Sequence, residues 1–198
     1  MAKRRKVSNP LALAVLAELT PEPMHPYEMG RRLKEHGKDR NIKYNRGSLY
    51  MVVEQLRKAG FVAEQETVRD TQRPERTVYA ITAEGRAELQ DWMRELLAEP
   101  QHEYPAFGVA LCLLVALPPA ESAELLGRRL AALTAKNEST RAALAKAAED
   151  GVPRVFLIEE EYGLALLEAE QRFVTDLIES LGEPEFVRPW HDIFGSLE

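Results

Sequence analysis

The sequence predicts a mainly α-helical protein that carries one short β-hairpin and divides into two parts. Apolar residues recur at helical spacing over most of the chain, and two β-branched and aromatic runs stand close together in its first half. A polar segment bounded by prolines, residues 99–105, precedes a second half that is helical throughout. We therefore expect an N-terminal domain over residues 1–98 and a C-terminal helical domain over residues 99–198.

Three helices are expected before the hairpin. The first begins at Pro10, with Asn9 as its N-cap, because asparagine suits the cap and proline the first helical position. The second begins at Pro26. The third begins near residues 45–46 and ends at Gly60, a residue type that favours the position just after a helix.

The hairpin follows directly. Residues 61–68 and 77–81 have the composition of strands, and the polar residues 69–76 between them form a loop. Another helix is expected over residues 82–97. The order helix, helix, helix, strand, strand, helix is that of a winged helix-turn-helix.

The sequence of the second half predicts one short helix and two long helices. Residues 107–117 form the short apolar helix, and two consecutive prolines end it. Long helices are expected over residues 120–148 and from the turn at residues 150–153 to residues 181–182. A helix of about 30 residues is about 45 Å long, too long for a compact monomeric domain of this size. We therefore expect an α-helical dimerisation domain.

The charge of the chain is unevenly distributed. Residues 1–94 carry 18 Lys and Arg against 13 Asp and Glu, a net charge of +5, whereas the remainder carries 8 against 19, a net charge of −11. This asymmetry indicates a polyanion-binding module joined to a part that binds no polyanion.

Cysteine content and hydropathy bound the location. The sequence has one cysteine, Cys112, so an intramolecular disulfide is excluded and a reducing compartment is the default. Cys112 lies in an apolar run and is expected in the core. The longest apolar run, residues 109–117, is far shorter than the ~20 residues that span a bilayer. We expect a cytoplasmic protein without a membrane partner.

Catalytic and metal-binding patterns are missing from the sequence. No phosphate-binding glycine loop, nucleophile motif or catalytic pair with recognisable spacing occurs. The four histidines show no metal-ligand spacing with one another or with Cys112. We therefore expect a protein that is not an enzyme and has no cofactor or metal.

The third helix carries the candidate DNA-reading residues. Its apolar side fixes its orientation, so the opposite side presents Arg46, Ser48 and Tyr50, which can contact base edges or phosphates. Lys43 and Asn45, just before the helix, can contact the sugar-phosphate backbone. The alternative is that these residues are only the solvated face of a surface helix.

Two further basic segments are candidates. In the hairpin loop, Arg73 and Arg76 are expected in the minor groove or on phosphate, the alternative being a solvated loop. The basic arm, residues 3–6, either contacts phosphate or only aids solubility. On the helix after the hairpin, Trp92 either packs in a dimer core or lines a pocket for an aromatic effector.

The ordered series of these motifs resembles the PadR family of bacterial transcriptional regulators. The resemblance covers residues 10–97, about half of the chain, and departs from the family at Pro26, where glycine is usual. It implies DNA contacts by Tyr27, Ser48 and Tyr50 and a homodimer of the branch with a large C-terminal domain. The matching segments are residues 13–19, 25–29, 47–50, 56–62 and 76–85.

Two functions are weighed from these features. The first is a homodimeric, sequence-specific regulator, a repressor in preference to an activator, that binds a pseudo-palindromic operator in double-stranded DNA. The resemblance implies release by a small aromatic effector bound between the DNA module and the helical domain. The alternative is a winged-helix module for protein–protein interaction or assembly, without sequence-specific DNA binding.

Overall fold

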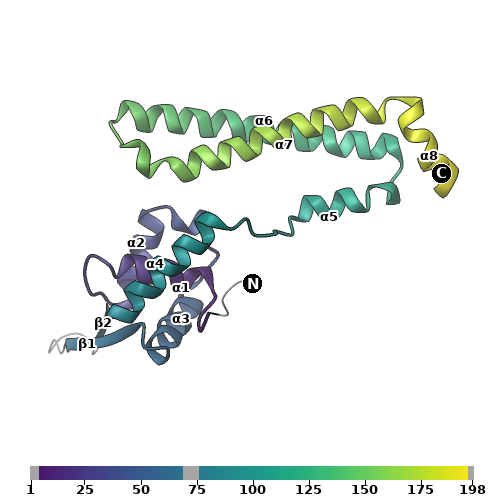
Figure 1. Ribbon diagram of the computed structural model, residues 1–198. Helices are drawn as coiled ribbons and strands as arrows, with labels where there is room; N and C mark the ends of the chain where they lie inside the picture. The colour runs from purple at the N-terminus through teal and green to yellow at the C-terminus, as the bar shows by residue number, and fades with distance from the viewer. Residues whose placement is uncertain (1–4, 69–75, 196–198) are drawn as a thin grey trace. The chain divides into compact units, whose positions relative to one another are not determined.

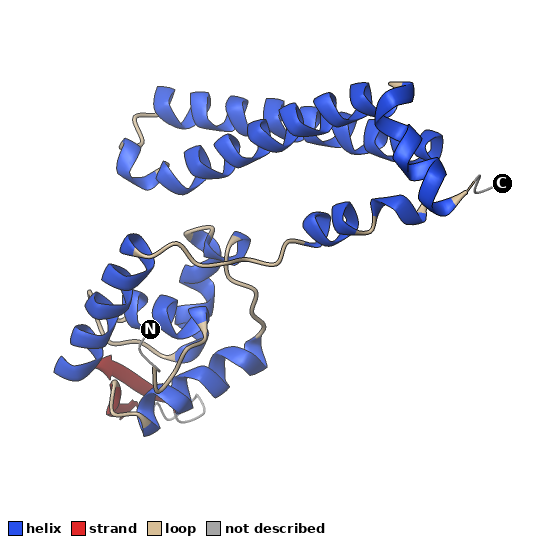
Figure 2. Cartoon of the chain, turned by 45° about the vertical axis from the view of Figure 1, so that its right-hand side comes forward, coloured by secondary structure: helices blue, strands red, loops and turns tan. Residues whose placement is uncertain are grey.

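A computed structural model describes residues 5–68 and 76–195 and confirms the mainly helical fold (Figures 1 and 2). Its contacts divide the chain into two units, Met1–His102 and Glu103–Glu198. Within the described ranges, no helix is long and apolar enough to cross a membrane.

The first unit has the predicted order of three helices, two strands and a helix. The predicted starts at Pro10 and Pro26 are confirmed to the residue, and the strands agree with the prediction to within one residue. Its elements are α1 (Pro10–Glu18), α2 (Pro26–Glu35), the 3₁₀ helix η1 (Lys38–Arg40), α3 (Arg46–Lys58), β1 (Val62–Val68), β2 (Arg76–Ile81) and α4 (Ala83–Ala98).

Side-chain caps explain where these helices begin. The Asn9 side chain accepts a hydrogen bond from the Leu11 amide, as predicted for an N-cap. At α4, the Thr82 hydroxyl accepts one from the Gly85 amide at 3.0 Å and donates one to the Gly60 carbonyl at 2.7 Å. Thr82 therefore joins the start of α4 to the end of α3, where Gly60 has the left-handed φ of 82°.

The core of this unit lies among its four helices and the base of the hairpin. Leucines and valines on the inner faces of α1 and α3 are almost fully buried, and Met29 and Leu33 of α2 complete the cluster. Burial of each such side chain contributes about 1.5–3 kcal/mol. This core holds α2 and α3 at a fixed separation.

The β-hairpin is antiparallel, from the pair Val62 and Ile81 to the pair Val68 and Arg76, with a bulge between Glu64 and Glu66. A feature not predicted from the sequence extends it. Met24, just before α2, pairs with Tyr79 through two backbone hydrogen bonds of 3.0 and 3.1 Å. The start of α2 is thereby fixed to the second strand.

The second unit is an antiparallel pair of long helices with shorter helices at one end. The long helices agree with the prediction, and a further helix, α8, follows them. The elements are α5 (Ala106–Cys112), the 3₁₀ helix η2 (Leu114–Ala116), α6 (Pro119–Glu149), the 3₁₀ helix η3 (Arg154–Phe156), α7 (Ile158–Leu181) and α8 (Pro184–Phe194).

Two predictions for the short apolar segment are wrong. The predicted helix over residues 107–117 ends at Cys112 and continues as a 3₁₀ turn, because the chain must become extended at Leu117, before Pro118. Cys112, predicted in the core, is exposed. The short helix α5 has no buried residue, so its apolar composition did not reveal which side faces the protein.

The interior of the α6–α7 pair combines apolar and polar contacts. Leu126, Leu133 and Val174 are buried between the helices. Among them lies a polar layer in which the Gln171 side chain accepts a hydrogen bond from Asn137 and donates one to Thr134 at 3.1 Å. A buried polar layer disfavours other registers of a helix pair.

Candidate nucleic-acid interface

Helix α3 separates its residues into a buried side and an exposed side. Leu49, Val52, Val53 and Leu56 are at most 2% exposed, whereas Arg46, Tyr50 and Met51 face outward. The sequence-predicted reading residues therefore lie on the accessible side of a helix that the core holds firmly. A single helix of this diameter fits the major groove of B-DNA.

The first turn of α3 is held by a reciprocal capping box. The Ser48 amide donates to the Asn45 side-chain oxygen, and the Asn45 amide donates to the Ser48 hydroxyl oxygen, both at 2.9 Å. The Ser48 hydroxyl also donates its proton to the Asn45 carbonyl at 2.9 Å. Ser48 therefore positions the helix start, and while the cap is intact it can only accept from a base, not donate to a phosphate.

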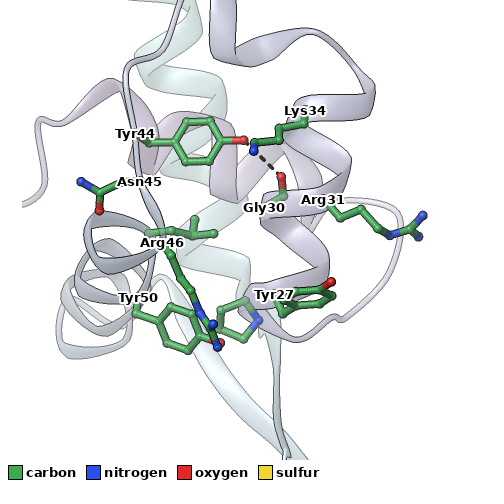
Figure 3. Close-up of a pocket in the computed structure, with 10 residues that line it drawn as sticks. Tyr27, Gly30, Arg31, Lys34, Tyr44, Asn45, Arg46 and Tyr50 are labelled. Carbon is green, nitrogen blue, oxygen red and sulfur yellow. Dashed lines mark hydrogen bonds between the residues drawn. The ribbon is translucent and has the colours of Figure 1, made fainter.

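A groove of about 530 Å³ lies between α2 and α3, and we call it the α2–α3 groove. It brings together predicted residues from both helices. Figure 3 shows Arg46 lying alongside the Tyr50 ring, with Tyr27 across the groove. The lining residues are Pro26, Tyr27, Gly30, Arg31, Lys34, Tyr44, Asn45, Arg46, Leu49 and Tyr50.

The floor of the groove depends on a close approach at Gly30. The Tyr44 hydroxyl donates a hydrogen bond of 3.1 Å to the Gly30 carbonyl, drawn as a dashed line in Figure 3. A Cβ atom at Gly30 would lie 3.0 Å from the end of the Leu49 side chain, so any larger residue requires that side chain to move by a few tenths of an ångström. Burial raises the pKa of the Tyr44 phenol, with a smaller effect from Asp39, so the hydroxyl stays a donor.

Aromatic contacts connect the starts of the two helices. The guanidinium of Arg46 lies 5.8 Å from the centre of the Tyr50 ring, and the Tyr50 ring makes an edge contact with His25. The His25 Nδ1 atom accepts a hydrogen bond of 3.1 Å from the Tyr27 amide and caps α2. His25 therefore contacts both the Tyr50 ring and the Tyr27 amide, a role that its spacing in the sequence did not reveal.

The groove also contains basic residues that the sequence analysis did not single out, Arg31 and Lys34. Both lie one turn or more along α2 from Tyr27, a helical spacing that could have identified them. Arg31 forms ion pairs with Glu28 and with Glu35, the latter at 2.7 Å. Its hydrogen bond to Glu28 is the main cause that raises the Arg31 pKa and lowers that of Glu28.

Two further predicted DNA contacts, Lys43 and Tyr27, have described side chains. Lys43 is exposed just before α3, and Tyr27 is 60% exposed at the start of α2. Arg76 opens β2 opposite Val68, but its side chain lies outside the described residues. Arg73 also lies outside them.

Trp92 lies in the core of the first unit and is 6% exposed. Arg5 covers it, with the guanidinium 5.2 Å from the ring centre and ion pairs to Glu88 at 2.6 Å, to Asp91 at 3.3 Å and to Glu95. Arg5 of the basic arm is therefore paired with α4, and residues 3 and 4 lie outside the described residues, so the phosphate contact of the arm stays a prediction. The roles of Trp92 in an effector pocket or a dimer core stay predictions.

Clusters of metal-binding side chains are not found in the part of the chain that the structure describes. His25 instead caps a helix, and His36 lies 3.0 Å from Glu18 on the surface. The expectations that the protein has no metal, no cofactor and no catalytic activity stay predictions.

The three helices, the hairpin behind them and the exposed start of α3 define the first unit as a winged helix-turn-helix. This class presents its last helix before the hairpin to a partner. Residues 14–91 match the family described as transcriptional regulator PadR-like. This part of the chain is a PadR-like domain.

Solved structures share this fold over most of the chain. Bacillus subtilis PadR in complex with operator DNA is 17% identical, with a TM-score of 0.70, over 87% of this chain and 99% of that one. The same protein in complex with p-coumaric acid gives 17% identity and a TM-score of 0.69 over the same shares. A PadR-like regulator from Bacillus cereus is 18% identical, with a TM-score of 0.59, over 87% and 98%. No curated protein matches the chain.

Proposed function

We propose that this protein is a cytoplasmic, homodimeric repressor that binds a specific sequence in double-stranded DNA. The observation that carries the proposal is the first turn of α3. A capping box fixes its backbone, and Arg46 and Tyr50 face outward beside the α2–α3 groove. The net charge of +5 in residues 1–94 supplies the attraction to a polyanion.

Each candidate residue has a distinct role in this proposal. Arg46 reads a base edge in the major groove, guanine being its usual partner, and Tyr50 supports its guanidinium. Tyr27 and Lys43 contact phosphates on either side of the DNA major groove, and these contacts set the register of α3 on the duplex. Asn45 and Ser48 hold the helix start, and Arg73 and Arg76 contact the flanking DNA.

Exposed apolar side chains of the second unit support the homodimer. Ile158, Tyr162, Leu166 and Phe173 are each about half exposed or more and recur on one face of α7. A face of this kind on a long helix needs a partner surface. A two-fold dimer places two recognition helices about 34 Å apart, one turn of B-DNA, which implies a pseudo-palindromic operator.

A small aromatic effector completes the proposal. Bacillus subtilis PadR has a structure in complex with p-coumaric acid, and Trp92 offers this chain a large ring for stacking. Because Arg5 lies over that ring, an effector that stacks on Trp92 must displace it. Such a ligand shifts the protein toward a state with lower DNA affinity.

The salt dependence of DNA binding tests this function against a protein-interaction module. Fluorescence anisotropy with duplex DNA from upstream of the protein's own gene should show binding that weakens steeply as salt rises. The expected slope of log K against log salt is about −0.9 per phosphate contacted. An interaction module would show only weak binding that is equal for all duplexes.

A reporter experiment tests the sign of control. With the footprinted site cloned upstream of a reporter gene, the protein should lower expression, and an inducing aromatic compound should restore it. Higher expression in the presence of the protein would identify an activator instead.

A further inference from the structure

The turn between α6 and α7 presents apolar side chains to solvent. Val155 and Phe156 are 66% and 72% exposed, and Val152 is 38% exposed. We call these three residues, at the turn of the α6–α7 helical pair and not of the β-hairpin, the hairpin tip. Phe156 is a large, rigid side chain, and a partner surface that covered it would bury a large apolar area.

The opposite end of the same unit contains an apolar hollow. A pocket of about 350 Å³ lies between α5, η2 and the start of α6, and we call it the base pocket. Leu113, Leu117 and Leu125 line it and are 37–63% exposed. Figure 1 shows the α6–α7 turn at one end of this unit and α5 with α8 at the other.

An apolar stripe runs along α7 from the turn. Ile158, Tyr162, Leu166 and Phe173 lie on one face of α7 and lead away from the hairpin tip. In total, thirteen large apolar side chains are exposed in the described part of this unit. The area exposed by those of the tip, the stripe and the base pocket is on the order of the ~800 Å² that each partner buries in a standard interface. A second copy of the chain can cover this area.

A two-fold axis allows two alignments of such pairs. A parallel alignment places tip against tip and pocket against pocket, which leaves the pockets unfilled and the two Phe156 rings in competition for one space. An antiparallel alignment places each tip at the partner's base pocket, so that a projecting side chain meets a hollow. Protein interfaces pack to the density of protein interiors, which favours the second alignment.

We infer that the second units pair antiparallel, and that Phe156 of each copy fills the base pocket of the other. The inference rests on the proposed homodimer and specifies its geometry. Each base pocket is then filled only in the dimer, because the partner's Phe156 occupies it.

The single cysteine of the chain makes this inference testable by cross-linking. Cys112 is exposed and stands between two residues that line the base pocket, Leu111 and Leu113. The variant Phe156→Cys adds one thiol at the tip. Oxidation of the full-length variant, or reaction with a short bis-maleimide, should give a covalent dimer, because disulfides form where Cα atoms lie within about 7 Å.

Two control proteins separate the alignments. The wild-type protein can join only pocket to pocket, and the double variant Phe156→Cys, Cys112→Ser only tip to tip. We expect the covalent dimer from the single variant alone. A dimer from either control, or none from the single variant while sedimentation shows a non-covalent dimer, overturns the inference and leaves the proposed function intact. A monomeric wild-type protein in sedimentation contradicts the proposed homodimer itself.

A double-mutant cycle provides a measurement without cross-linking. Phe156→Ala and Leu125→Ala should each raise the dimer dissociation constant about tenfold. The double variant should show much less than the product of the two effects, because both changes remove the same contact. Independent effects of the two substitutions on the dissociation constant would show that the two side chains do not meet. A small apolar ligand found in the base pocket of the dimer would show the same.

Discussion

The imidazole of His25 packs edge-on against the phenol ring of Tyr50, with the ring centres 6.1 Å apart and the planes at 75°. His25 stands immediately before α2, and Tyr50 lies in the second turn of α3. The same imidazole accepts a hydrogen bond from the Tyr27 amide. One side chain thus fixes the start of the first helix and the exposed ring of the second.

Substitution of His25 should separate these two functions. His25→Ala removes the cap and the ring contact, and should cost about 1 kcal/mol of stability together with a loss of DNA affinity. His25→Asn keeps an acceptor for the Tyr27 amide, so it should restore most of the stability but not the affinity. Thermal unfolding and fluorescence anisotropy measure the two quantities. Full affinity in His25→Asn would show that the contact with Tyr50 has no part in binding.

Tyr50→Ala should strongly weaken specific DNA binding and leave the dimer intact. The ring is 37% exposed and supports the Arg46 guanidinium, so its removal frees that side chain without opening the core. We expect at least a tenfold loss of affinity, about 1.4 kcal/mol, and an unchanged sedimentation coefficient. Met51→Ala, at a neighbouring exposed position on α3, is the matched control. Equal effects of the two variants would remove Tyr50 from the reading surface.

Local signals explain why most of the first unit could be predicted. Asn9 and Thr82 cap their helices through amides within three residues, and Pro26 takes the first position of α2, so each start leaves a trace in the sequence. The β-branched and aromatic content of its two strands identified the hairpin in the same way. Local chemistry also predicted the exposed side of α3, because its buried leucines and valines recur at helical spacing.

Contacts between distant segments left no such trace. Met24 pairs with Tyr79 through backbone atoms only, which any residue could supply. Arg5 reaches Glu88 across 83 positions, and a basic arm gives no sign of such a partner in its own sequence. Ser48 was predicted to contact DNA, and the pattern Asn-x-x-Ser did not disclose that its hydroxyl is used within the helix cap.

Replacement of Arg5 tests the contact that closes the N-terminal arm onto α4. The side chain is 4% exposed and is enclosed by Trp92 and three carboxylates. Arg5→Ala leaves those carboxylates facing one another, so we expect a loss of about 2 kcal/mol. This is below the 3–5 kcal/mol of a fully buried pair, because the acids retain some water. Arg5→Lys should lie between the two proteins in chemical denaturation.

The same variant distinguishes a structural arm from a DNA-binding arm. Because the Arg5 guanidinium is occupied by α4, the salt slope of DNA binding should be the same in Arg5→Ala as in the wild type. A slope reduced by about one unit would show that Arg5 leaves α4 and contacts a phosphate in the complex.

Gly85, in the first turn of α4, should be the residue that least tolerates substitution where α4 meets the β-hairpin. A Cβ atom at this position would lie 2.0 Å from the Phe61 carbonyl oxygen and 2.9 Å from the Ile81 side chain, so Gly85→Ala must push α4 away from the hairpin. We expect a destabilisation of about 2 kcal/mol or more in chemical denaturation. Gly127→Ala is the matched control, because that glycine is also helical but has open space around its Cα. It should stabilise the protein by about 0.5–1 kcal/mol. If both substitutions stabilised the protein, α4 would not pack against the Phe61 backbone. Other contacts would then have to set the angle between the β-hairpin and α3.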